Sequence, residues 1–213
     1  QKQTQVSWSN HNRNHRSSHL SRRALTSIGE SCFDDGMAAG FSPNWFIAIP
    51  IDPEGWFAPT PSPPDGIRLF HQEDLHLTLA FLGSVSEQQA RAGWEALRWN
   101  LAPTTVTLGA VVPMGAPGRY SALSATLEQG RATIEQAIGA CRDAICDAAG
   151  ARRESRSPKA HITIARPSRN ASDSTRAGGL RWAQRIDYHQ PSVPLHTIAL
   201  YTWANDRKVR QFR

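Results

Sequence analysis

Short apolar runs, several of them alternating with polar residues, are the main regular feature of this chain after about residue 45. Successive side chains of a strand point to opposite faces, so runs of this length and pattern predict β-strands. The predicted strands are Trp45–Ile51, Leu75–Leu82, Thr105–Val112, Tyr120–Leu127, Ala160–Ala165 and Leu195–Trp203. We therefore expect β-structure to form the framework of the protein.

Two segments between these strands have helical patterns instead. Ser86, with Gln89 three residues later, is a capping-box pattern that predicts a helix over Glu87–Leu101. Further along, apolar residues recur at helical spacing ahead of a glycine stop at Gly150, namely Ile134, Ile138, Cys141 and Ile145. Strands interrupted by two long helices predict an α+β architecture.

Three other segments are predicted to lack regular structure. Pro53–Pro64 is too rich in proline for a regular helix or a central strand. The basic, polar segment Ala151–Lys159 is predicted to be a loop. Residues 1–40 have almost no apolar periodicity, so they cannot offset the entropy of ordering and are predicted to be a disordered tail or an upstream extension. The folded domain is expected to span residues 41–213.

Composition narrows the class of protein. The chain has 213 residues, of which 39% are hydrophobic and 20% charged, as is usual for a globular protein. No apolar run is long enough to cross a bilayer, so we expect no membrane partner. A net charge of +6 favours an anionic partner. Three cysteines without a Cys-x-x-Cys pair indicate a reducing compartment, hence a cytoplasmic protein.

The same short motif occurs in two of the predicted strands. His76-Leu77-Thr78 lies in the first and His161-Ile162-Thr163 in the second, 85 positions later. In each strand the imidazole and the hydroxyl point to one face, while the residue between them points to the other. If the two strands lie side by side, two imidazoles and two hydroxyls surround one small space. Such a site suits a reaction that takes up one proton and releases another, as phosphodiester cleavage does.

Both motifs resemble the paired His-x-Thr signatures of the two-histidine phosphoesterases. Within that superfamily they are most similar to the bacterial RNA 2′,3′-cyclic phosphodiesterases, also called 2′-5′ RNA ligases. The resemblance also includes Trp45–Pro50 and Thr197–Tyr201, and it covers most of the chain after about residue 41. It implies two pseudo-symmetric lobes whose antiparallel sheets line a central cleft, with helices outside.

The resemblance also implies an activity and roles for the motif residues. The expected reaction is metal-independent hydrolysis of RNA or nucleotide 2′,3′-cyclic phosphate ends to 2′-phosphates, by a monomer without a cofactor. It makes His161 the general base and His76 the general acid, although the sequence alone does not decide which is which. Thr78 and Thr163 are expected to donate hydrogen bonds to the non-bridging phosphate oxygens.

Two further residues are candidates for substrate binding. Arg166 stands where the family commonly has a phosphate-contacting arginine, but it has the opposite strand parity to His161. It therefore reaches the site only if the strand ends or bulges after Thr163. Phe81 could stack a nucleobase or could belong to the core. No His, Cys, Asp or Glu cluster has metal-ligand spacing, so we expect no metal site.

Several interpretations remain open at this stage. The same site could join RNA ends as a 2′-5′ ligase, or the protein could be a non-catalytic module that binds RNA ends. The family usually has a helix between its first strand and first motif, where this chain has Pro53–Pro64, which leaves the substrate undefined. His71, His189 and His196 lack the motif and are expected to be structural or surface residues. Three arginines form either a nucleic-acid patch or a solvated loop: Arg152, Arg153 and Arg156.

Overall fold

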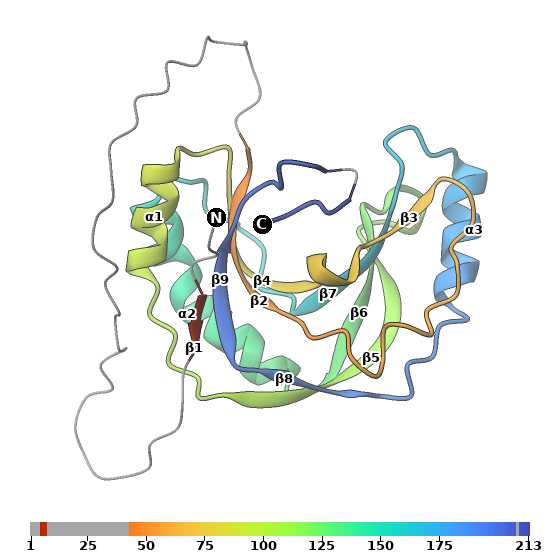
Figure 1. The fold of residues 1–213 in the computed structure, drawn as a ribbon, viewed down its shortest axis with the longest axis horizontal. Coiled ribbons are helices and arrows are strands. Elements are labelled where there is room, and N and C mark those ends of the chain that lie inside the picture. The colour runs from red at the N-terminus through yellow and green to blue at the C-terminus, as the bar shows by residue number, and fades with distance from the viewer. Residues whose placement is uncertain (1–4, 8–42, 208) are drawn as a thin grey trace.

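The computed structural model describes residues 5–7, 43–207 and 209–213. In these residues nine strands form one antiparallel sheet, with three α-helices around its outside (Figure 1). The strands are β1 (Gln5–Ser7), β2 (Trp45–Pro50), β3 (Ile67–Leu69), β4 (His76–Gly83), β5 (Thr104–Met114), β6 (Ala122–Gln129), β7 (His161–Pro167), β8 (Ser192–Leu195) and β9 (Thr197–Tyr201). The helices are α1 (Glu87–Ala96), α2 (Arg131–Ala148) and α3 (Asp173–Ala183), and two 3-10 turns are η1 (Gln72–Asp74) and η2 (Pro117–Arg119). The predicted α+β class is confirmed.

The two motif strands meet in the middle of this sheet. The strand order is β1-β9-β2-β4-β7-β6-β5-β8, and β3 lies beside β7 as well. β4 and β7 are joined through the single register pair Leu77 and Ile162, whereas their outer neighbours pair over several residues. The sheet therefore consists of two antiparallel halves that meet at the β4–β7 seam. Each half contributes one motif strand, which confirms the predicted pair of pseudo-symmetric lobes.

The sheet curves strongly. β8 pairs with β5 and β9 pairs with β2, so the two strands belong to different halves, yet only His196 separates them in sequence. One continuous stretch of chain therefore ties the outer strands of both halves together, as the lower part of Figure 1 shows. The sequence predicted one strand over Leu195–Trp203, and the structure divides this region because the chain changes partner strand at His196.

Buried apolar side chains join the helices to the sheet. α1 packs on α2, which lies against β4, while α3 packs against β3, β5, β6 and β7. This covers one half of the sheet with two helices and the other half with one. The core includes large side chains that are less than 2% exposed, among them Ile47, Leu77, Leu79, Leu108, Leu127, Ile134, Ile145 and Trp182. The predicted helix ahead of Gly150 is confirmed as α2, and Gly150 has the positive φ of 60° that suits a helix end.

The first helix begins as predicted and ends early. Ser86 and Gln89 form the reciprocal capping box at its start. The helix ends at Ala96 rather than Leu101, because the chain becomes extended at Leu97, where ψ is 123°. From there the burial alternates, with Leu97, Trp99 and Leu101 turned towards the core, and that period of two belongs to extended chain.

The region between β2 and β3 has no helix, as its prolines predicted. It packs instead against α3, whose Trp182 donates its indole N–H to the carbonyl of Pro61 at 3.0 Å. The sequence analysis predicted neither α3 nor β3. Two adjacent glycines, Gly178 and Gly179, weaken the helical pattern of α3, although Ser172 caps its start through the amide of Thr175.

Most of the predicted tail, residues 1–40, lies outside the described residues, as does Cys32. Residues 5–7 of that segment form β1, which pairs with β9. None of the helices in the described part of the chain has the length and apolar content needed to cross a membrane.

Candidate active site

The β4–β7 seam brings the two motifs together. Leu77 and Ile162 are fully buried and form its register pair. In antiparallel pairing the flanking residues then face one another, so His76 lies across from Thr163 and His161 lies across from Thr78. All four project on the side of the sheet opposite to Leu77 and Ile162, which we call the site face. The predicted juxtaposition of two imidazoles and two hydroxyls is a property of this one pairing.

His76 is enclosed and held in one tautomer. Its Nδ1 lies 2.6 Å from the carbonyl oxygen of Asp74. A carbonyl only accepts, so Nδ1 carries the proton and Nε2 is free to act at the site. Three aromatic rings surround the imidazole: Phe46 at 4.8 Å, Tyr201 at 5.8 Å and Phe212, edge on, at 5.4 Å between ring centroids.

This enclosure lowers the pKa of His76 from 6.5 to about 4. Burial is the main cause, because the charged imidazolium loses hydration that the aromatic rings do not replace. The Asp74 carbonyl opposes the shift, and the positive charges of Arg166 and His161 add to it. His76 is therefore neutral in the free protein at neutral pH.

His161 repeats the arrangement in a more open setting. Its Nδ1 lies 2.6 Å from the carbonyl oxygen of Lys159. Lys159 precedes His161 by two residues, just as Asp74 precedes His76 by two. Its side chain is only partly buried. Burial again lowers the pKa, and Arg166 and Lys159 lower it further. Both histidines thus present Nε2 to the site, but His76 is the more deeply buried of the two.

The threonines differ in their support. Thr163 is 6% exposed and accepts a long hydrogen bond, 3.4 Å, from the hydroxyl of fully buried Ser124 on β6. Because the Ser124 proton occupies one lone pair of Thr163, the Thr163 hydroxyl keeps its own proton for donation to a ligand. Thr78 faces Ala48 at the equivalent position and has no such neighbour. Nothing in the sequence pattern had marked Ser124.

A bulge in β7 turns Arg166 onto the site face. Ser124 pairs with Thr163 and its neighbour Leu123 pairs with Ala165, which leaves Ile164 as an extra residue. Ala165 therefore takes the buried face with Leu123, and Arg166 takes the site face. This is the condition that the sequence analysis set for Arg166 to reach the site. In this position the positive charge of Arg166 lowers the pKa of both motif histidines.

A bulge at the same place in the first motif does the same for Phe81. Ala48 pairs with Thr78 and Ile47 pairs with Ala80, so Leu79 is the extra residue. Phe81 then pairs with Phe46, which is on the same face of β2 as Ala48. Phe81 is 57% exposed, so it is not a core residue. Phe81 and Arg166 are thus equivalent residues, each five positions after a motif histidine.

The C-terminal segment forms one wall beside His76, which the sequence analysis missed. Asp74 is 1% exposed, and its two carboxylate oxygens accept the backbone N–H groups of Gln211 at 2.8 Å and Phe212 at 3.1 Å. The segment also pairs back onto Thr202, and Arg210 forms an ion pair with Glu73 at 3.0 Å. Two adjacent acidic residues before His76, Glu73 and Asp74, were the only signal, and they do not indicate their distant partners.

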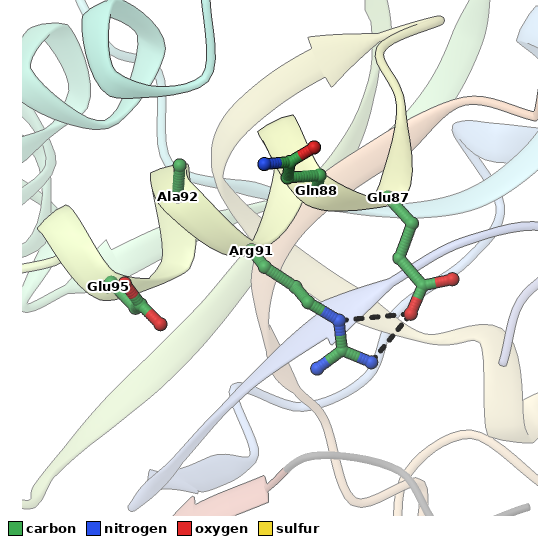
Figure 2. A pocket seen from close by; sticks show the side chains of 5 residues that line it. All are labelled: Glu87, Gln88, Arg91, Ala92 and Glu95. Atoms are coloured by element: carbon green, nitrogen blue, oxygen red, sulfur yellow. Dashed lines mark hydrogen bonds and ion pairs between the residues drawn. The ribbon is translucent and has the colours of Figure 1, made fainter. Parts of the chain in front are cut away.

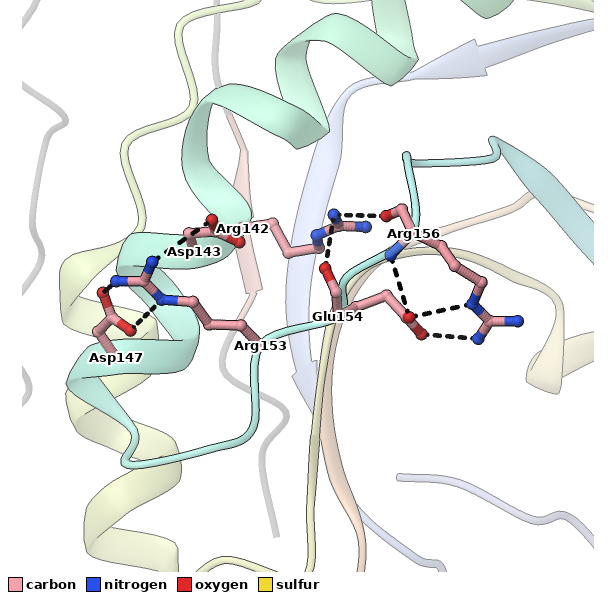
Figure 3. Close-up of polar contacts among 6 residues, drawn as sticks. All are labelled: Arg142, Asp143, Asp147, Arg153, Glu154 and Arg156. Carbon is pink, nitrogen blue, oxygen red and sulfur yellow. Dashed lines mark hydrogen bonds and ion pairs between the residues drawn. The ribbon is translucent and has the colours of Figure 1, made fainter.

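The basic loop before His161 is partly neutralised, because Arg153 and Arg156 form ion pairs, whereas none is seen for Arg152 in the described part of the chain. Figure 3 shows Arg153 bound to Asp147 and Arg156 bound to Glu154. Arg142 of α2 donates to the carbonyls of Glu154 at 3.2 Å and Arg156 at 2.9 Å. The loop is therefore fastened to α2, and its salt bridges are exposed and add little stability. Its function in the fold is to deliver Lys159 and His161 to the seam.

Three other histidines lie in the described part of the chain, and none belongs to a motif. His71 caps η1 by accepting the amide of Glu73, His189 pairs with Asp187, and His196 is an exposed residue between β8 and β9. Among the described residues no group of three or more His, Cys, Asp or Glu side chains could hold a metal ion.

Two surface hollows occur that no histidine lines. One of about 500 Å³ runs along α1 and is lined by Glu87, Gln88, Arg91, Ala92 and Glu95. Figure 2 shows that its main contact is the helical ion pair of Arg91 with Glu87. The other, of about 280 Å³, is lined by residues that include Glu73, Tyr201 and Arg210. Neither hollow is lined by a motif histidine or threonine, so the site face at the seam is the candidate active site.

Comparison with solved structures identifies this architecture. LigT from E. coli, in a complex with 3′-AMP, is 24% identical, with a TM-score of 0.56 over 80% of this chain and 93% of that chain. The chain has the LigT fold. A protein described as a phosphoesterase is 24% identical over 81% of this chain and 94% of its own, with a TM-score of 0.57. TT0787 from Thermus thermophilus is 20% identical over 80% and 93%, also with a TM-score of 0.57.

The similarity to LigT confirms, at the level of the fold, the resemblance to two-histidine phosphoesterases that the motifs predicted. No protein-family model matches the chain, and no curated protein sequence matches it either. The LigT fold was therefore detectable from sequence only through the short motifs and their strand context.

Proposed function

We propose that this protein is a metal-independent phosphodiesterase that hydrolyses 2′,3′-cyclic phosphate ends of RNA or nucleotides to 2′-phosphates. One observation carries the proposal: two imidazoles, each held through Nδ1 by a backbone carbonyl, present Nε2 across a seam that also bears two threonines. The LigT fold supports it, and LigT itself has been solved with 3′-AMP, with NADP+ and with phosphate.

The proposed reaction needs one neutral and one protonated imidazole. The base takes a proton from water as the water oxygen bonds to phosphorus. The P–O3′ bond breaks on the opposite side, and the leaving 3′-oxygen receives a proton from the acid. The phosphate remains on the 2′-oxygen. Each positioned proton transfer contributes about 10²–10⁴-fold to the rate.

The surroundings of the histidines bear on which one is the base. The resemblance makes His161 the base and His76 the acid. Burial favours the opposite assignment, because it lowers the pKa of His76 the more strongly and so keeps His76 neutral in the free protein. A bound phosphate would have to raise the pKa of His76 strongly for it to act as the acid, and we therefore assign the base to His76 and the acid to His161.

The remaining site residues are assigned to binding. Thr78 and Thr163 donate to the non-bridging oxygens, where negative charge grows as water attacks. Arg166 neutralises the phosphate and takes its place beside the histidines through the Ile164 bulge. Phe81, exposed on the site face beyond Thr78, offers a stacking surface for the nucleobase.

We also propose that the protein acts as a monomer in the cytoplasm. Cys141 and Cys146 are buried free thiols, and burial raises the pKa of Cys141 to about 11, which makes it unreactive. Such thiols are suited to a reducing compartment.

The decisive test is turnover in EDTA of 2′,3′-cyclic AMP and of a short RNA that ends in a 2′,3′-cyclic phosphate. We expect 2′-AMP and a 2′-phosphate RNA end, identified by chromatography against 2′- and 3′-phosphate standards. The double variant His76→Ala/His161→Ala, purified in parallel, controls for contaminating nucleases.

The other possible outcomes separate the alternatives. Joining of a cyclic-phosphate end to a 5′-hydroxyl end through a 2′-5′ bond would identify a ligase that runs the same site in reverse. Tight binding of 2′-phosphate ends with no turnover would identify a binding module. A 3′-phosphate product would contradict the proposed direction of ring opening.

The pH dependence of kcat/KM tests the protonation states. Below about pH 4 both imidazoles of the free enzyme are protonated and no base remains. Above the lowered pKa of His161 both are neutral and no acid remains. We therefore expect a bell-shaped profile for 2′,3′-cyclic AMP whose maximum lies on the acidic side of pH 6.5. A plateau that extends unchanged to pH 8 would contradict this assignment.

A further inference from the structure

A second arginine lies beside Arg166 on the site face. Arg68 of β3 and Arg166 of β7 are direct partners in the antiparallel register, so their side chains project from the same face of the sheet. Arg68 is exposed, and the guanidinium of Arg166 lies over the ring of Phe70 at 5.4 Å. Two guanidinium groups are thus held next to each other at one end of the site.

In the part of the chain that the structure describes, this pair of positive charges has no ion-pair partner. Neither Arg68 nor Arg166 forms an ion pair with a carboxylate in the described part of the chain. Two acids that follow Arg68 in the chain are engaged elsewhere, Glu73 with Arg210 and Asp74 with two backbone N–H groups. The two like charges repel each other, because after burial the charge of Arg68 is the cause that lowers the pKa of Arg166. An anionic ligand would relieve it.

The two arginines stand at different distances from the reacting centre. Arg166 lies on the motif strand β7 itself and lowers the pKa of both histidines, whereas Arg68 lies on β3 as the register partner of Arg166. The order along the site face is therefore histidines, Arg166, Arg68. Neighbouring strands are about 4.8 Å apart, a step of the same order as the spacing of successive phosphates in a nucleic acid strand.

We propose that Arg68 forms a second phosphate subsite, which binds the phosphodiester on the 5′ side of the terminal nucleotide while Arg166 binds the cyclic phosphate. The proposal rests on the function proposed above and makes it more specific. The preferred substrate is an oligonucleotide end rather than a nucleoside 2′,3′-cyclic monophosphate. Arg68 comes from β3, a strand that the sequence pattern did not predict.

The test compares two substrates that differ by one charge. The dinucleotide ApA 2′,3′-cyclic phosphate carries the extra phosphodiester, and its analogue with a neutral methylphosphonate linkage keeps both bases and sugars. We expect the wild-type protein to have a kcat/KM about tenfold higher for the charged dinucleotide, since Arg68 makes a charge-assisted hydrogen bond to that substrate alone. Arg68→Gln should bring the ratio of the two rates close to one.

Salt dependence gives a second readout. Loss of one phosphate contact should reduce the slope of log kcat/KM against log salt for the charged dinucleotide, because one ion pair that salt screens is removed. Arg131→Gln is the matched control, because Arg131 is an exposed arginine at the start of α2. This variant should retain both the substrate ratio and the slope of the wild-type protein.

Several results would overturn the subsite. One is an equal rate on both dinucleotides in the wild-type protein. Another is an equal loss on both in Arg68→Gln, which would mean that both arginines bind the cyclic phosphate. If neither dinucleotide is turned over, the proposed function fails. The subsite is then tested by equilibrium binding, as the ratio of the affinities for ApA 2′-phosphate and its methylphosphonate analogue.

Discussion

His76→Ala and His161→Ala are each expected to reduce kcat for 2′,3′-cyclic AMP by about 10²–10⁴-fold. Each substitution removes one of the two proton transfers, because the second imidazole is held by its own carbonyl and cannot move to replace the first. The double variant should be little slower than the worse single variant, since one proton transfer without the other gains little.

Folding of these variants needs its own control. His76 lies inside an aromatic enclosure, so alanine leaves a cavity, and His76→Gln keeps most of the volume. His196→Ala is the matched histidine control, because His196 is exposed between β8 and β9. Wild-type activity in either motif variant, with the fold retained, would remove the paired-histidine mechanism.

A substrate with sulfur in place of the 3′-oxygen separates the two roles. A thiolate leaves without a proton from the enzyme, so a variant that lacks only the general acid should recover much of its rate on this substrate. We expect recovery in His161→Ala and none in His76→Ala. The reverse result would restore the assignment that the sequence resemblance implied.

Asp74→Asn should release the C-terminal wall and raise the pKa of His76 from about 4 towards 6.5. The two carboxylate oxygens accept two backbone N–H groups, and an amide offers one acceptor and a competing donor in their place. Loss of a buried acceptor costs about 1–3 kcal/mol, which is enough to undock a short segment. Without Phe212 against it, the His76 imidazolium regains hydration.

NMR titration of the histidine rings measures this change, and amide hydrogen exchange at Gln211 and Phe212 reports the wall directly. Asp187→Asn is the matched control, because Asp187 also accepts a backbone N–H, from His189 at 2.7 Å, but at an exposed site. If the pKa of His76 stays near 4 while the segment exchanges freely, the enclosure by Phe212 is not what lowers it.

The local structure of the motif strands followed from sequence. Alternation of apolar and polar residues predicted both strands and the shared face of each histidine and threonine. The capping box and the stop at Gly150 placed helix ends correctly, because these signals act within a few residues of chain. The apolar spacing in α2 reported burial on one face, which also depends on local geometry alone.

Sequence reasoning failed where distant segments decide the structure. The end of α1 is set by Leu97, Trp99 and Leu101 reaching the core in extended chain, and α3 is stabilised by packing that outweighs its glycines. The wall at His76 joins Asp74 to residues 137 positions or more away. No local pattern encodes which distant backbone groups a buried carboxylate will accept.

The sequence by itself therefore determined the reactive groups of this protein: two imidazoles, each with a hydroxyl on its own face. Only the tertiary structure decided their chemistry. Pairing of Leu77 with Ile162 brings the groups together, and two bulges turn Arg166 and Phe81 onto the site face. The physical reason is that strand register and burial are properties of the packed sheet. Register decides which side chains lie together, and burial decides how far each histidine is shielded from water. This shielding is the main cause of the lowered pKa values.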